Sequence, residues 1–148
     1  MIIVVSGAVC TGKTTIARKL AAKHNAEYID VNKIIGKYKL SSGYDPKRKC
    51  RIVDIDKLNA VLVKIIKHSK QNLVIDSHLY HYLPCKYVDK CIITKCNIAE
   101  LRKRLKRRGY SKEKIAENID AEIFDVCYHE AKEIGHSVKV IDTSSKNS

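Results

Sequence analysis

The stretch Gly7-Ala8-Val9-Cys10-Thr11-Gly12-Lys13-Thr14-Thr15 follows directly on the apolar run 1–6. Behind it, apolar residues at 16, 17, 20 and 21 recur at helical spacing. A strand that ends in a turn bracketed by glycines and restarts as a helix directs several backbone N–H groups at one point. The helix dipole also favours an anion there. The stretch therefore predicts a phosphate-binding loop, which both flanks favour over a glycine turn that only caps a helix.

Two side chains of this loop are suited to a nucleoside triphosphate. Lys13 is long enough to reach the β- and γ-phosphates. The hydroxyl of Thr14 is placed to coordinate the Mg²⁺ that neutralises those phosphates. We therefore expect a site for Mg²⁺ with ATP at the end of the first strand.

Size and composition bound the other possibilities. The chain has 148 residues, enough for one domain, and 29 Lys and Arg against 16 Asp and Glu, a formal net charge of +13. This charge favours polyanionic partners such as nucleotides or RNA, although it is also compatible with solubility alone. The six cysteines form no CxxC pair, so neither a zinc ribbon nor a redox motif is indicated. We expect no secretory leader, no membrane span and a cytoplasmic location.

Strand and helix patterns alternate along the chain. We expect five strands, at about 1–6, 27–31, 72–76, 90–94 and 137–142. Helical spacing is expected over 13–24 and 54–68, from Asn97 to Gly109, and from Ser111 to Gly135. With a phosphate loop on the first crossover, this alternation predicts a three-layer α/β/α P-loop domain with a parallel sheet. Spacing alone does not give the strand order.

Residues 32–53 depart from the alternation because they are polar, basic and punctuated by glycine. We interpret them as an irregular segment lying over an anionic ligand, the alternative being a solvated connecting loop.

The apolar stretch that begins at Asn72 ends in Asp76-Ser77-His78. An aspartate at the carboxyl end of a strand, downstream of a phosphate loop, is placed to hold Mg²⁺ directly or through a water. Asp76 is therefore our predicted metal residue, although such an aspartate can also be a cap. We expect His78 to orient a water or to contact the γ-phosphate.

A basic run, residues 102–108, packs six cations into seven positions before Gly109. It predicts either a solvated or RNA-facing surface, or basic residues of a mobile lid that grip transferring phosphates. After the last strand, Thr143 and Ser144 are weaker candidates for contact with the base of the nucleotide.

Several segments together resemble a known family. They are the phosphate loop, Gly43-Tyr44-Asp45, Val53-Asp54-Ile55-Asp56, Asp76-Ser77-His78, and above all Arg108-Gly109-Tyr110-Ser111 running into residues 117–124. On these the chain resembles the small adenylate kinase-like NTPases of archaea and eukaryotes that act in late maturation of the small ribosomal subunit. The resemblance spans nearly the whole chain, and the segment beginning at Arg108 is more specific than the phosphate loop.

The resemblance implies a nucleoside monophosphate (NMP) kinase fold with five strands in the order 2-3-1-4-5. It also implies one domain over 1–148, with an NMP-binding insert at about 30–53 and a short lid at about 107–117. The implied activities are NMP kinase, ATP plus AMP to two ADP, and ATPase. The implied partner is ribosomal protein uS11 of the small subunit, with a possible rRNA contact through 102–108.

The site residues carried over are those of the loop and the lid. ATP binding falls on Cys10, Gly12, Lys13, Thr14, Thr15 and Arg108, catalysis on Lys13, Asp76, His78 and Arg108, and the metal on Thr14 and Asp76. Lysines stand where adenylate kinases usually have an arginine that clamps the monophosphate, so Lys37, Arg48 or Arg51 is expected to replace it. Two alternatives stay open: an ATPase assembly switch with little kinase activity, and a P-loop kinase for another small acceptor.

Overall fold

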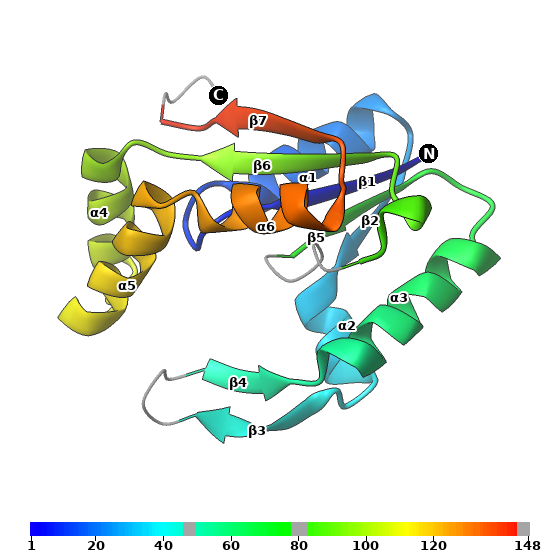
Figure 1. Ribbon diagram of the computed structural model, residues 1–148, viewed down its shortest axis with the longest axis horizontal. Coiled ribbons are helices and arrows are strands. Elements are labelled where there is room, and N and C mark those ends of the chain that lie inside the picture. The colour runs from blue at the N-terminus through cyan, green and yellow to red at the C-terminus, as the bar shows by residue number, and fades with distance from the viewer. Residues whose placement is uncertain (46–49, 78–82, 145–148) are drawn as a thin grey trace.

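The computed structural model describes residues 1–45, 50–77 and 83–144. Five parallel strands form one sheet with helices on both faces (Figure 1), which confirms the predicted α/β/α class. In spatial order the strands are β2 (Glu27–Asp30), β5 (Leu73–Asp76), β1 (Ile2–Ser6), β6 (Lys90–Lys95) and β7 (Val138–Asp142).

The sheet order reads 2-5-1-6-7 with these labels and therefore differs in its numbers from the expected 2-3-1-4-5. The change arises because the insert contributes two strands of its own, β3 (Ser41–Asp45) and β4 (Cys50–Val53), which pair antiparallel in a separate sheet. Our interpretation of 32–53 as irregular was wrong. The polar residues of the insert whose burial is described, such as Lys33 and Lys37, occupy exposed positions of regular elements.

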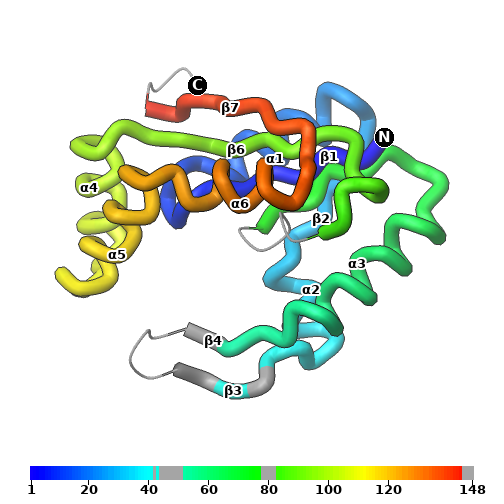
Figure 2. The backbone as a smooth tube through the Cα atoms, in the orientation of Figure 1, coloured from blue at the N-terminus to red at the C-terminus, as the bar shows by residue number. Residues whose placement is uncertain are grey.

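The insert begins with a short helix, α2 (Val31–Lys37). The carboxylate of Asp30 accepts a hydrogen bond from the amide of Asn32 at 2.9 Å, so β2 ends at its helix cap. Val31 and Ile35 are buried while the lysines of α2 face solvent. In the tube view the hairpin lies beyond α2, apart from the main sheet (Figure 2).

The remaining helices are α1 (Lys13–Lys23), α3 (Ile55–His68), α4 (Ile98–Arg107), α5 (Lys112–Ile123) and α6 (Val126–Ile134), with a 3₁₀ turn, η2 (Cys85–Tyr87). Two of the helix starts predicted from sequence are confirmed by their caps. The side chain of Asn97 accepts from the amide of Glu100 at 2.8 Å, and that of Ser111 from the amide of Lys114 at 3.2 Å. Within the described ranges, no helix is both long and apolar enough to cross a bilayer.

The single helix expected between Ser111 and Gly135 is two helices, so that prediction was wrong. The helical conformation is interrupted at Asp125, which adopts a left-handed conformation (φ 52°). Lys95 of β6 pairs with Asp125 and, at 3.3 Å, with the buried carboxylate of Glu122. Apolar periodicity continues across the break, and these long-range ion pairs are not visible in it.

The sheet is buried on both faces. On one face α1 places Ile16, Ala17 and Ala21 against β1 and β5. On the other, α2, α3 and α6 cover a larger core that includes Leu58 and Leu62 of α3. A third cluster joins α4 and α5 to the loop after β1. The loop is thus supported by both the sheet and the α4–α5 pair.

We predict that Lys95→Met lowers the free energy of unfolding by about 2 kcal/mol at pH 8, between the values typical of exposed and buried ion pairs. Burial raises the pKa of Glu122, and the Lys95 ammonium offsets part of that shift. The native state therefore holds a proton on Glu122 more readily than the unfolded chain does. The contribution of Glu122 to the free energy of unfolding is complete at low pH and is lost as pH rises through its raised pKa.

The loss caused by Lys95→Met should accordingly be smaller at pH 4 than at pH 8. Urea unfolding at the two pH values checks this. Lys90→Met, at the exposed start of the same strand, serves as the control and should change little. Equal losses at both pH values would contradict the electrostatic explanation.

Candidate nucleotide-binding site

The loop between β1 and α1 has the backbone of an anion cradle. Gly7 (φ 146°), Cys10 (φ 64°) and Gly12 (φ 84°) all have positive φ. A Cβ built on Gly7 would lie 2.6 Å from the carbonyl oxygen of Thr94 and 2.7 Å from the hydroxyl of Thr11, so no larger residue fits. Gly12 caps α1 without a side-chain hydrogen bond, which leaves the helix N-terminus to an external acceptor.

Lys13 lies across this loop. Its Nζ donates to the carbonyl oxygens of Gly7 and Ala8, each at 3.2 Å. Burial lowers the pKa of Lys13, and the charge of Asp76 only partly offsets that shift. A partly desolvated ammonium group that contacts carbonyl oxygens forms a much stronger, charge-assisted hydrogen bond when a phosphate reaches it.

Asp76 ends β5 beside the start of α1. Its Oδ2 accepts two hydrogen bonds, from the hydroxyl of Thr14 at 2.8 Å and from that of Tyr28 at 2.6 Å. Burial and the hydrogen bond to Asp76 raise the pKa of Tyr28 to about 12, so its phenol stays protonated at neutral pH. Sequence reasoning paired Thr14 with Asp76 but missed Tyr28.

The strand order could have revealed Tyr28. β2 and β5 are parallel neighbours in which Tyr28 pairs with Val74 and Asp30 with Asp76. Residues two apart on a strand share a face, so Tyr28 is a diagonal neighbour of Asp76. Spacing along the chain does not give this adjacency.

The oxygens of Thr14 and Asp76 suit Mg²⁺, which takes hard oxygen ligands and is typically held by one or two carboxylates together with substrate phosphates. In the part of the chain that the structure describes, no group of three or more His, Cys, Asp or Glu forms a dedicated metal cage. The donor set therefore fits an ion that arrives with a nucleotide. His78, the other residue expected here, lies outside the described residues.

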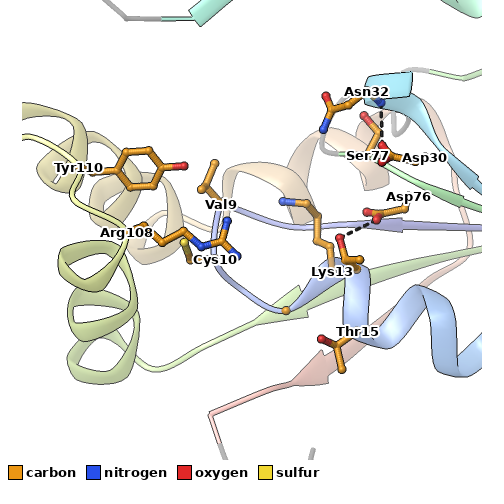
Figure 3. A pocket seen from close by; sticks show the side chains of 12 residues that line it. Val9, Cys10, Lys13, Thr15, Asp30, Asn32, Asp76, Ser77, Arg108 and Tyr110 are labelled. Atoms are coloured by element: carbon orange, nitrogen blue, oxygen red, sulfur yellow. Dashed lines mark hydrogen bonds between the residues drawn. The ribbon is translucent and has the colours of Figure 1, made fainter. Parts of the chain in front are cut away.

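A cavity of about 330 Å³ opens over the loop (Figure 3). Its lining residues come from the loop and α1, from the start of α2, from the end of β5 and from the α4–α5 connection; they are Val9, Cys10, Gly12, Lys13, Thr14, Thr15, Asp30, Asn32, Asp76, Ser77, Arg108 and Tyr110. Lys13 lies between two flanks, with Arg108 and Tyr110 on one and Asp30, Asn32 and Ser77 on the other. The loop residues expected to bind ATP and Arg108 are thus brought to one cavity.

A second cavity, of about 350 Å³, adjoins the loop at Cys10 and Gly12 and is otherwise lined by Arg104, Arg107 and Arg108. Arg104 Nη1 donates to the carbonyl of Cys10 at 3.2 Å, and Nη2 to that of Thr143 at 2.6 Å. Arg104 and Arg107 were not singled out from the sequence. The signal was present, because positions 104, 107 and 108 share one helix face.

The basic run therefore divides between two surfaces. Arg104, Arg107 and Arg108 line the cavity beside the loop, while Arg102, Lys103 and Lys106 are exposed to solvent elsewhere on α4. The two hypotheses for this run, lid and polyanion-facing surface, stay predictions that concern different residues of it.

Thr143 and Ser144, expected near the base, are held by other contacts. The buried Thr143 donates through its hydroxyl to the carbonyl of Thr11 at 2.6 Å. Ser144 Oγ accepts from the amide of Asn97 at 2.8 Å and donates to Asp142. Their hydroxyls fasten the last loop to its neighbours, and the expected contact with the base stays a prediction.

Among the expected replacements for the clamping arginine, only the side chain of Lys37 is described, and it is not among the residues that line the cavity. Lys37 is exposed on α2, with its Nζ 5.5 Å from the centre of the Tyr38 ring. Arg51 belongs to β4, and Arg48 lies outside the described residues.

Comparison with known proteins identifies the family. Residues 3–125 match the family model described as AAA domain. A Methanocaldococcus jannaschii protein named "Putative adenylate kinase" is 33% identical over 147 residues, covering 99% of this chain and 79% of that protein. A protein of the same name from Thermococcus onnurineus is 38% identical, with 99% and 77% covered. The "Adenylate kinase isoenzyme 6 homolog" of Caenorhabditis elegans is 32% identical over 131 residues, with 88% and 72% covered. The chain belongs to this archaeal and eukaryotic adenylate kinase family.

Solved structures with lower sequence identity to this chain have a similar fold. YorR of Bacillus subtilis, in complex with phosphorylated GDP, is 18% identical with a TM-score of 0.61, over 97% of this chain and 86% of that one. Shikimate kinase of Bacteroides thetaiotaomicron is 12% identical with a TM-score of 0.59, over 96% and 85%. Both show the same arrangement of sheet and helices.

We predict that Arg104→Met weakens ADP binding about tenfold, because two charged hydrogen bonds that fasten the loop to the end of β7 are lost before the nucleotide arrives. Titration calorimetry measures the change. Arg102→Met, an exposed cation on the same helix, is the matched control and should alter affinity less than twofold. Similar losses in both variants would indicate a general effect of charge.

Proposed function

We propose that this protein is an NMP kinase that converts ATP and AMP to two ADP, with ATPase activity when no acceptor is bound. The observation that carries the proposal is the single cavity that joins the loop, Lys13 and Arg108 to the start of α2. A triphosphate on the loop and an acceptor beside α2 would meet at the Lys13 ammonium.

Each residue has a defined role in this proposal. The loop amides and Lys13 bind the β- and γ-phosphates, and Arg108 neutralises charge on the phosphoryl group in flight. Thr14 and Asp76 would hold Mg²⁺, which would supply further charge neutralisation. A phosphate oxygen is already a good nucleophile, so transfer to an NMP requires no general base.

The donor base would occupy the second cavity. Guanidinium groups stack on aromatic rings, and Arg107 and Arg108 line that cavity beside Cys10 and Gly12. Residues 107–117 would act as the lid, and 30–53 as the NMP-binding insert. When the lid closes without an acceptor, a water near His78 would be the acceptor in its place.

We further propose, from the family resemblance, that the protein acts with ribosomal protein uS11 during maturation of the small ribosomal subunit. The exposed cations Arg102, Lys103 and Lys106 support a contact with rRNA, because they are not among the residues that line the two cavities and carry the charge that phosphates attract. An ATPase switch in this assembly step is compatible with the same site.

A second candidate function is a kinase for a hydroxyl-bearing acceptor. It is favoured by the acceptor flank of the cavity, where Asp30, Asn32 and Ser77 offer carboxylate, amide and hydroxyl groups. Such groups suit hydroxyls better than they suit a dianionic phosphate.

The deciding experiment measures ATP consumption with AMP, with each other NMP and with no acceptor, and repeats each with uS11 added. We expect AMP to raise the rate well above the rate without acceptor, with two ADP formed per turnover. Lys13→Ala should abolish both activities. A rate that no NMP increases would contradict the kinase proposal, and a rate that uS11 leaves unchanged would contradict the assembly proposal.

Asp30→Asn separates the two acceptors. Asparagine retains an oxygen for the cap of α2 but removes a negative charge beside the acceptor. If the acceptor is a monophosphate, loss of the repulsion should lower the KM for AMP about two- to fivefold. Steady-state kinetics measures this, and Asp56→Asn in the exposed first turn of α3 is the control. An increase in the KM for AMP would contradict a phosphate acceptor at this flank.

A further inference from the structure

We propose that Tyr28 is a positioning residue for the metal site: its hydroxyl fixes the carboxylate of Asp76 so that Oδ1 is the oxygen presented to Mg²⁺ or its water. The inference rests on the proposed function, because it concerns the nucleotide-bound ion. Tyr28 belongs to a strand that carries none of the residues predicted from sequence to bind ATP or the metal ion.

The hydrogen bonds define which oxygen is available. Oδ2 accepts from Tyr28 at 2.6 Å and from Thr14 at 2.8 Å, and an oxygen of a carboxylate has two lone pairs in its plane. The two hydroxyls therefore use both. Rotation of the Asp76 carboxylate about χ2 would break both hydrogen bonds together. The two bonds therefore leave Oδ1 as the oxygen available to the ion.

Packing fixes the position from which Tyr28 donates. Its ring lies against the apolar cluster formed by α1 with β1 and β5, which includes Val74 and Ala21. The guanidinium of Arg18 lies over the ring, 5.3 Å from its centre. A ring held on one side by apolar packing and covered by a cation delivers its hydroxyl to one point.

The arrangement matters for Thr14 as well. Thr14 gives its only hydroxyl proton to Asp76, so its oxygen lone pairs remain for a cation. Without Tyr28, Thr14 would be the one hydroxyl left on Oδ2, and the carboxylate could turn away from it. Partners that orient a metal ligand in this way typically change metal affinity 10- to 100-fold when they are removed.

The test is Tyr28→Phe, which keeps the ring and removes the hydroxyl. ADP affinity is measured by titration calorimetry in EDTA and at a series of Mg²⁺ concentrations. We expect the affinity in EDTA to stay within twofold of the wild type, and the increase that Mg²⁺ produces to fall about tenfold. Tyr38→Phe, at an exposed tyrosine after α2, is the matched control and should preserve the full Mg²⁺ effect.

A double-mutant cycle excludes a general structural effect. In an Asp76→Asn background, Tyr28→Phe should cause no further loss of the Mg²⁺ effect, because the carboxylate that it positions is already gone. Melting temperatures in EDTA verify that each variant is folded. An unchanged or increased Mg²⁺ effect in Tyr28→Phe, or an equal loss in both backgrounds, would overturn the inference.

The failure of this inference differs from a failure of the proposed function. If the wild type binds ADP with a clear Mg²⁺ effect and Tyr28→Phe does so equally well, only the role of Tyr28 is wrong. If the wild type shows no nucleotide binding at all, the proposed function fails first.

Discussion

The site depends on one steric constraint, the close approach of Gly7 to β6. The backbone of the loop can turn its amides toward a common point only if Gly7 lies against Thr94, at a distance where a Cβ would collide with the Thr94 carbonyl and the Thr11 hydroxyl. Thr11 and Thr94 share a buried hydrogen bond of 2.8 Å, and Thr94 also donates to the carbonyl of Ser6. Polar contacts with β6 therefore hold the backbone of the phosphate loop in place before any ligand is present.

The same loop is also held by the residue that follows β7 and by α4. Thr143 bonds to the carbonyl of Thr11, and Arg104 joins the carbonyls of Cys10 and Thr143. The hydroxyl of Thr143, a candidate for contact with the base, is therefore bonded to the loop. A hydroxyl near a phosphate loop has two possible partners, the ligand and the loop backbone, and here burial gives Thr143 to the backbone.

The features that sequence predicted are those encoded by local chemistry. The first strand, the loop, Lys13 and the caps Asn97 and Ser111 each follow from a short pattern with its own physical cause. The features it missed depend on what lies next to what in space. Tyr28 reaches Asp76 only across the β2–β5 pairing, and the break at Asp125 accompanies ion pairs to Lys95 of β6. Apolar periodicity is the same with or without that break. The regular insert was missed because exposed polar residues look alike in a loop and in a short helix or hairpin.

The charges around the cavity differ between its two flanks. Arg104, Arg107 and Arg108 lie on the side of Cys10 and Gly12, whereas the described acceptor flank carries Asp30 and, at the metal site, Asp76. A triphosphate bound in the cradle would be attracted toward these arginines. Any acceptor that approaches past Asp30 does so against a negative charge unless it is neutral there or arrives with a counterion. Within the described residues the cations therefore gather on the side of Cys10 and Gly12, and carboxylates on the side of α2 and β5. The identity of the acceptor rests on Asp30 and its neighbours more than on the phosphate loop, because the loop serves every acceptor equally.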